Sequence, residues 1–151
     1  GTAVLLERRD VWQALIAGDA SVVPVVDELL RYLTVVQVAF PRFALEDVEI
    51  SGHTVGAGEV VLCSLSSANR DVAFGPGAES VDPSRSAPPH MAFGHGIHRC
   101  VGAELGRLEM RIAYPALLRR FPGLRLAVPF EELKFRELSI VYGVDALPVA
   151  W

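Results

Sequence analysis

The chain has 151 residues, of which 51% are hydrophobic, and a formal net charge of −4 at pH 7. This length is typical of one domain that can bury a substantial core. No apolar run approaches the roughly 18 residues of a membrane span, and the acidic balance disfavours nucleic-acid binding. The two cysteines, Cys63 and Cys100, are too few for a disulfide framework, so we expect a reducing, cytoplasmic setting.

Helical patterns dominate the first part of the chain. Helices are predicted over residues 2–9, 10–17 and 21–33. Asp10 and Gln13 have the spacing of a capping box, which would start the second helix, and Gly18 would end it. In the third helix, Glu28 and Arg31 lie opposite the apolar stripe, so periodicity alone predicts an exposed ion pair worth about 0.3–0.5 kcal/mol.

The middle of the chain alternates between strand-like and loop-like segments. β-branched and aromatic residues predict short strands over residues 35–40, 48–50, 53–55 and 59–63. Ser51 and Gly52 are typical of a hairpin turn between the second and third of these strands. A short helix is expected over residues 66–70, and the Gly, Pro, Asp and Ser content of residues 71–89 predicts a loop.

A segment rich in glycine and histidine follows: Phe93-Gly94-His95-Gly96-Ile97-His98-Arg99-Cys100-Val101-Gly102. A cysteine at the start of a helix meets free amide donors and the positive end of the helix dipole, which favour the thiolate. A dinucleotide-binding loop is excluded because Arg99 stands where that motif needs its last glycine. Two other interpretations stay open: a zinc site of His95, His98 and Cys100, and a free cysteine that is simply buried.

The last part of the chain carries both apolar and basic residues. A helix is predicted over residues 101–120, with a buried face of Val101, Leu105, Leu108, Ile112, Ala116 and Leu117. Residues 99–125 contain six arginines against two glutamates, a net charge of +4, so the rest of the chain carries −8. Such a basic stripe suits an acidic partner, although an ordinary solvated helix face explains it equally well. Short strands are predicted over residues 124–128, 138–142 and 147–151.

The segment from Phe93 to Arg107 resembles the axial-ligand loop of the cytochrome P-450 family, the haem-thiolate monooxygenases. It matches the family signature Phe-Gly-x-Gly-x-His-x-Cys-x-Gly-x-x-Leu-x-Arg at every fixed position. The resemblance implies a mainly α fold with small β-sheets (α+β). In that fold, residues 1–151 form the C-terminal haem-ligand portion of the domain, without its N-terminal portion.

The resemblance also implies a chemistry for the loop. Cys100 would be the catalytic ligand to the iron of haem b, and the parent enzyme, of the soluble bacterial type, would insert one atom of O₂ into an organic substrate. Phe93 would pack beside the sulfur, Gly94 and Gly102 would belong to the cofactor-binding backbone, and His98 would donate to a haem propionate.

Residues outside the loop receive roles from the same resemblance. Arg42 would bind a haem propionate; the equal alternative is a loop arginine in solvent. Glu28, Arg31 and Arg85 would form a buried charge network behind the loop, in contrast to the surface pair that periodicity predicts. Breaking such a buried network would cost about 3–5 kcal/mol.

A redox partner completes the implied enzyme. Electrons from NAD(P)H would arrive through a small acidic ferredoxin that docks near Arg99, Arg107 and Arg111. The family's oxygen-activating helix and the elements that cover the substrate would lie upstream of this chain, so we expect little activity from the chain alone. The alternatives are a truncated, non-catalytic haem-binding remnant and a Cys/His zinc-binding module.

Overall fold

The computed structural model describes residues 1–86, 89–137 and 139–151. The α-helices are α1 (Thr2–Glu7), α2 (Arg9–Ala17), α3 (Val22–Leu33), α4 (Leu65–Ala68) and α5 (Ala103–Arg120). Short 3-10 helices are η1 (Val72–Phe74), η2 (Gly96–His98) and η3 (Phe130–Glu132). The strands form antiparallel pairs: β1 (Arg42–Phe43) with β4 (Val60–Val61), β2 (Val48–Ile50) with β3 (His53–Val55), and β5 (Arg125–Leu126) with β6 (Val149–Ala150). The predicted α+β class with small sheets is confirmed.

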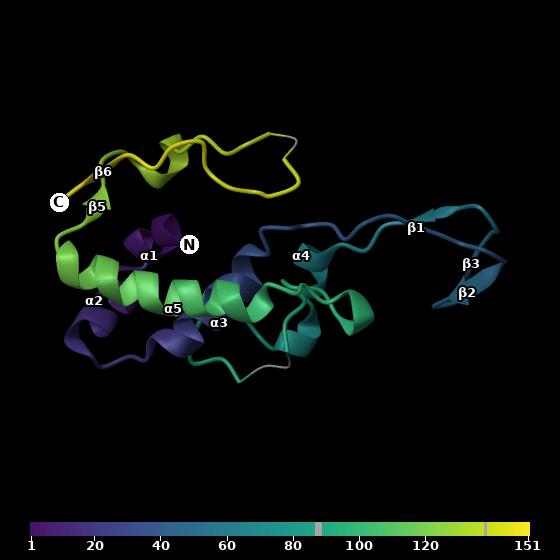
Figure 1. Ribbon diagram of the computed structural model, residues 1–151, viewed down its shortest axis with the longest axis horizontal. Helices are drawn as coiled ribbons and strands as arrows, with labels where there is room; N and C mark the ends of the chain where they lie inside the picture. Colours follow the sequence, from purple (N-terminus) through teal and green to yellow (C-terminus); the bar gives the residue numbers. More distant parts are fainter. Residues whose placement is uncertain (87–88, 138) are drawn as a thin grey trace.

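The helices gather around α5, and the small sheets lie at the two ends of the molecule. Figure 1 shows α1, α2 and α3 beside the green α5, with the β2–β3 hairpin at one end of the long axis and β5–β6 at the other. α5 contacts both α2 and α3, which places the main helical layer directly behind the segment that ends at Cys100. Among the described residues, no helix is both long enough and apolar enough to cross a membrane.

The hydrophobic core fills the space between these helices. Trp12, Leu5, Val25 and Leu29 are completely buried there, and Tyr114 reaches them from α5. Burying one side chain of this size contributes about 1.5–3 kcal/mol, so these contacts hold α1, α2, α3 and α5 together as one unit.

Helix ends agree with the sequence in two places and differ in one. Ser21 caps α3 by accepting the Val23 N–H, and Gly18 ends α2 with a left-handed backbone (φ 81°), as predicted. The capping box at Asp10 is wrong, because α2 begins one residue earlier and the Asp10 carboxylate binds Arg8 at 2.7 Å instead. The hydrogen bond from Arg8 lowers the pKa of Asp10 to about 2.

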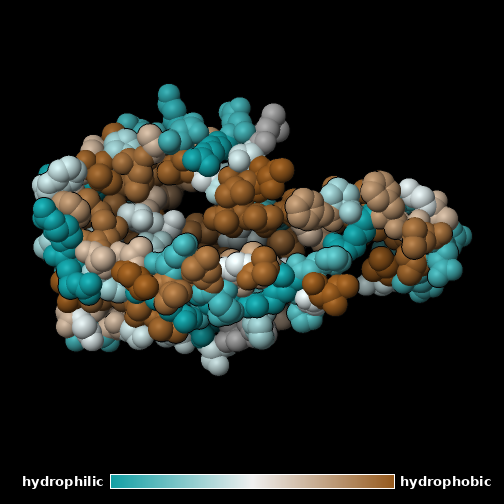
Figure 2. Space-filling model, in the orientation of Figure 1, coloured by the Kyte–Doolittle hydropathy of each residue, from teal (hydrophilic) through white to brown (hydrophobic). Residues whose placement is uncertain are grey.

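The predicted buried face of α5 is wrong except at Leu117, which is half-buried and packs against the core. Leu105, Leu108 and Ile112 are exposed, and Val101 lies before the helix begins. Figure 2 shows that apolar residues, in brown, form patches on the surface of the molecule. The face that contacts α2 and α3 instead contains the buried residues Ala103, Tyr114 and Leu118. Two arginines, Arg107 and Arg111, lie along that same face and bind Asp27 of α3. A pattern that counts only apolar residues therefore selects the wrong side.

The predicted strands are mostly shorter in the structure. The hairpin of β2 and β3 is confirmed, with the turn residues Ser51 and Gly52 at φ 51° and 81°. Residues 35–40 hold only isolated bridges, from Val36 to Val141 and from Val38 to Ser64. Of the strand predicted over residues 138–142, Leu138 lies outside the described residues, and the rest contributes the bridge at Val141.

Candidate functional site

The loop that carries Cys100 is held by its own backbone. The Gly94 N–H donates to the carbonyl of Met91, and the Cys100 N–H donates to the carbonyl of Phe93, each at 2.8 Å. Gly94 and Gly96 have φ values of 71° and 73°, a conformation that residues with a side chain rarely adopt. The glycines of the motif are thus required by the fold of the loop, which places Cys100 three residues before the start of α5.

The Cys100 thiol is exposed and has open space beside it. A methyl group added at Gly102 would lie 3.9 Å from Cys100 Sγ, so glycine keeps that side of the sulfur free. Ile97 and Val101 flank the cysteine in sequence and are almost fully exposed. The N–H of Ala103, the first residue of α5, donates to the Cys100 carbonyl at 3.2 Å and ties the cysteine to the helix start.

Two expected donor residues lie at the surface. His98 ends η2 and is exposed, two residues before Cys100. Arg42 lies on β1, also exposed, with its Nη1 at 4.0 Å from Cys63 Sγ of the segment after β4. Their positively charged or N–H groups could bind carboxylates, and neither is engaged with a carboxylate in the described part of the chain.

Phe93 packs against α5. Its ring lies under the guanidinium of Arg107, with 4.9 Å from Cζ to the ring centroid. A Cβ at Gly106 would come within 3.6 Å of the ring, so the small residue makes room for it. The ring of His90 lies 6.3 Å away at 44°. The carbonyl of Phe93 accepts the hydrogen bond from the Cys100 amide, so Phe93 connects α5 to the cysteine.

The structure brings Glu28, Arg31 and Arg85 together in a buried network. The two α3 side chains are only 6% and 2% exposed, although helical periodicity placed them on the surface. Arg31 Nε donates to Glu28 Oε2 at 2.7 Å, and Arg85 Nε donates to Glu28 Oε1 at 3.2 Å. Burial alone would raise the pKa of Glu28, but hydrogen bonds from Arg31 and from the Asp82 amide outweigh it and leave the pKa below its usual value.

Arg31 also holds the loops that precede the cysteine segment. It donates to the carbonyls of Asn69, Ala78 and Ser80 at 2.6, 2.8 and 3.0 Å. Asn69 is completely buried, and its Oδ1 accepts the Met91 N–H at 2.6 Å. Sequence reasoning missed Asn69, which lies within the short helix predicted over residues 66–70; in the structure it directly follows α4. This contact extends the network to the start of the Cys100 loop.

Asp27, next to Glu28 on α3, was also missed. Its carboxylate accepts from Arg107 Nε at 2.9 Å and from Arg111 Nη2 at 3.4 Å. Arg107 lies within 3.4 Å of the ring of His90, whose pKa is lowered by burial and then by the charge of Arg107. Asp27 thereby joins α3 to α5 across the face that also carries Phe93.

The three arginines expected to face a partner differ in exposure. Arg107 is only 16% exposed and is bound by both Asp27 and Glu104. Arg111 shares Asp27, and Arg99 pairs with the exposed Glu104 at 2.9 Å. Much of the charge counted in the sequence is therefore compensated locally, and Arg99 presents the most open guanidinium of the three.

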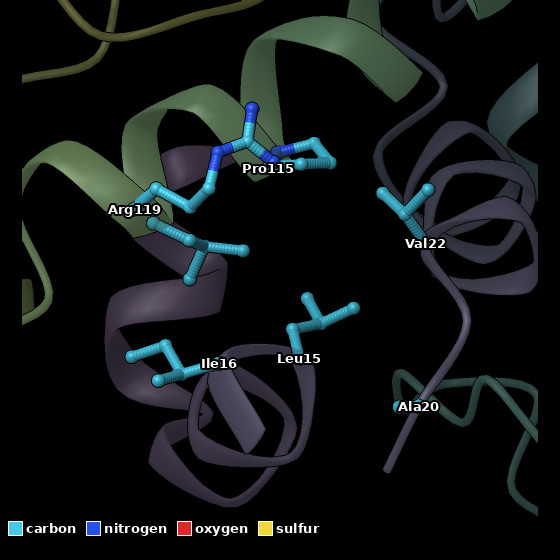
Figure 3. Close-up of a pocket in the computed structure, with 7 residues that line it drawn as sticks. Leu15, Ile16, Ala20, Val22, Pro115 and Arg119 are labelled. Atoms are coloured by element: carbon cyan, nitrogen blue, oxygen red, sulfur yellow. The ribbon is translucent and has the colours of Figure 1, made fainter. Parts of the chain in front are cut away.

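Neither a metal cluster nor the pocket between α2 and α5 points to a different site. Within residues 1–86, 89–137 and 139–151, no three His, Cys, Asp or Glu side chains lie close enough together to hold a metal ion, which argues against the zinc hypothesis. A pocket of about 380 Å³ lies between α2 and α5, with Leu15, Ile16 and Arg119 on its wall (Figure 3). It lies beside Pro115, roughly 18 Å along α5 from the helix start near Cys100, so it plays no part in this site.

Comparison with known proteins identifies clear relatives. The model of the family described as "Cytochrome P450" matches residues 22–128. "Cytochrome P450-SU2" of Streptomyces griseolus is 53% identical over 150 residues, which cover 99% of this chain and 37% of the relative. "Cytochrome P450 105C1" of Streptomyces sp is 50% identical over 151 residues, covering 100% and 40%.

Solved structures agree with these matches. The crystal structure of CYP105P1 in complex with filipin I superposes with a TM-score of 0.93 at 45% identity and covers 100% of this chain and 38% of that one. The structure of the hybrid P450 OxyBtei(BC/FGvan) gives a TM-score of 0.89 at 51% identity, covering 97% and 38%. The chain thus spans about two fifths of the length of the relatives it matches.

Proposed function

The chain belongs to the cytochrome P450 family, and from this premise we propose that Cys100 is the thiolate ligand to the iron of haem b in a monooxygenase that oxidises an organic substrate with O₂. The observation that carries the proposal is the exposed Cys100 thiol at the end of a loop fixed by Phe93 and two left-handed glycines. When bound through a thiolate, haem supplies the activation of O₂ for insertion of one oxygen atom.

The residues around Cys100 fit this cofactor. The sulfur is accessible, Gly102 leaves space for a planar ring, and Ile97 and Val101 offer apolar contacts beside it. The cofactor also carries two carboxylates, which need donors. Arg42 and His98 would supply them, the first as a charged donor and the second through a ring N–H.

The chain's own contribution is to position the sulfur. Cys100 would bind the iron as a thiolate, while its own amide stays bonded to Phe93. The network of Glu28, Arg31 and Arg85 would keep the preceding loops from shifting, because its buried charges are satisfied only in this arrangement. These residues act by holding the loops in place and by their electrostatic field, and they need not transfer protons themselves.

An acidic ferredoxin is the proposed electron donor, with electrons that originate from NAD(P)H. The surface of this chain that binds the ferredoxin would centre on Arg99, which is exposed and directly precedes Cys100 in the sequence. Arg107 and Arg111 would add to the field behind it. We expect Arg99→Glu to slow reduction by such a donor, and the effect should fade as salt rises, because exposed charges are screened. An unchanged rate at low salt would contradict this docking face.

The proposed compartment is the bacterial cytoplasm. Cys63 and Cys100 are both exposed free thiols, and a reducing compartment keeps such thiols from oxidation.

Haem titration followed by reduction under carbon monoxide tests the ligand. Thiolate ligation gives a strongly red-shifted Soret band, which should be lost in Cys100→Ser and kept in Cys63→Ser, the other exposed cysteine and thus the matched control. A band that survives Cys100→Ser would overturn the proposal. Bound zinc without haem uptake would favour the zinc-binding module instead.

A haem-binding protein without oxygenase activity is the second candidate. It is favoured by the open exposure of Cys100, Ile97 and Val101, since oxygen chemistry needs a site that excludes water. A protein that shows the thiolate band but does not oxidise substrate when a competent ferredoxin is supplied would support this second candidate.

A further inference from the structure

A line of contacts runs from α3 to the cysteine loop through three residues: Asp27, Arg107 and Phe93. Asp27 Oδ1 accepts from Arg107 Nε at 2.9 Å, and the Arg107 guanidinium lies over the Phe93 ring at 4.9 Å. The Phe93 carbonyl accepts the Cys100 amide at 2.8 Å. We name these three residues the Asp27 relay. They are distinct from the buried network of Glu28, Arg31 and Arg85, which holds the loops that precede the Cys100 loop.

The surroundings hold the relay in one arrangement. Arg107 is 16% exposed, so its charge is only weakly screened by salt. Phe93 is confined on a second side by Gly106, where a Cβ would approach its ring to 3.6 Å, and by the half-buried ring of His90. If Asp27 lost its charge, Arg107 would keep only Glu104, which is 74% exposed, as a close carboxylate among the described residues.

From these contacts we infer that Asp27, acting through Arg107, is a positioning residue that holds Phe93 against α5 and sets the charge over the Phe93 ring, whose residue holds the Cys100 amide. The inference rests on the proposed function, because its consequence is the ease with which a haem bound at Cys100 accepts an electron. An added electron is stabilised by nearby positive charge and opposed by negative charge. In the ion pair, Asp27 therefore lowers the reduction potential and Arg107 raises it, and mutation of one residue at a time separates the two effects.

The central test is the reduction potential of the haem-loaded protein. Asp27→Asn keeps an oxygen for Arg107 Nε but removes the negative charge, so the potential should rise. Arg107→Gln removes the positive charge, so the potential should fall. Asp27→Glu restores the carboxylate and should return the potential toward the wild-type value. A purely structural role would loosen the loop in both variants and shift both potentials in the same direction, and that result would overturn the inference.

Glu104→Gln provides the matched control. Glu104 also binds Arg107, at 3.1 Å, but its side chain is 74% exposed, against 39% for Asp27. Its removal should shift the potential upward by less than Asp27→Asn does, because water and salt screen an exposed charge. A shift equal to or larger than that of Asp27→Asn would contradict the special position of Asp27.

A second measurement does not depend on haem. Asp27 and Phe93 are connected through Arg107, so their substitutions should be coupled. In a double-mutant cycle with Asp27→Asn and Phe93→Leu, the effects on the unfolding equilibrium constant should deviate from additivity by about threefold or more. Additive effects would overturn the relay. If the wild-type chain showed no thiolate-ligated haem, the proposed function would fail, whereas this cycle would still decide whether the relay exists.

Discussion

Removal of Arg31 gives the sharpest test of how the site is supported. Arg31 is 2% exposed and donates five hydrogen bonds, two to Glu28 and three to backbone carbonyls of the loops behind the Cys100 segment. In Arg31→Met the volume is largely kept, but Glu28 Oε2 loses its donor at 2.7 Å. Glu28 Oε1 still accepts from Arg85 and from the Asp82 amide.

The expected loss follows from this count. Breaking a buried ion pair by removing one partner costs about 3–5 kcal/mol. The three carbonyls lose a charged donor, while the contacts that remain to Glu28 limit its desolvation penalty, so we expect a value within that range. Since a domain is typically stable by only about 5–15 kcal/mol, the variant should lie close to unfolding at room temperature.

Urea unfolding followed by circular dichroism measures this loss. Arg99→Met is the matched control, because its pair with Glu104 has a similar distance, 2.9 Å, but is exposed; we expect a loss below about 1 kcal/mol. Adding Glu28→Gln to Arg31→Met should recover part of the stability, since it removes the unpaired charge. A loss of less than about 1 kcal/mol for Arg31→Met alone would refute the reasoning that burial makes this network strong.

Three further predictions follow from local geometry. Gly96→Ala should destabilise the loop by about 1 kcal/mol and weaken haem uptake, measured by titration, because an L-residue is strained at φ 73°. Ser21→Ala should cost about 1 kcal/mol in urea unfolding, since α3 loses its side-chain cap. The lowered pKa of Glu28 means that its charge stabilises the fold above the ordinary glutamate pKa. The stability difference between wild type and Glu28→Gln should therefore be constant from neutral pH to about pH 5 and shrink as the pH falls below about 4.3.

Local signals in the sequence were sufficient for the elements that depend on backbone conformation. The Ser51-Gly52 turn, the helix stop at Gly18, and Gly94 and Gly96 of the Cys100 loop are all positions where φ is positive. At such positions the residue type is dictated by the backbone itself, so a single sequence predicts them well. The proposed role of Cys100 came instead from the resemblance of the complete loop motif to a known family.

Features that depend on tertiary contacts could not be predicted in this way. Arg107 and Arg111 lie on the core-facing side of α5 because Asp27 neutralises them there, and only the packing of α3 against α5 reveals the pairing. Glu28 likewise sits opposite the apolar stripe of α3 and is still buried. The resemblance to a known family indicated this burial, whereas periodicity opposed it. Asn69 had no partner in its sequence neighbourhood, since its amide binds Thr34 and its Oδ1 accepts from Met91.

Helix α3 fixes the cysteine from both sides. Consecutive residues on a helix point roughly 100° apart, so Asp27 and Glu28 reach different parts of the molecule. Glu28 holds the loops that lead into the Cys100 segment, and Asp27 holds α5, which leads out of it. The Cys100 thiol is exposed, as the proposed haem ligand has to be, so it cannot be held by its own burial. Its position is therefore set by two carboxylates on one helix. A substitution at either carboxylate should shift the position of the sulfur, although neither contacts it.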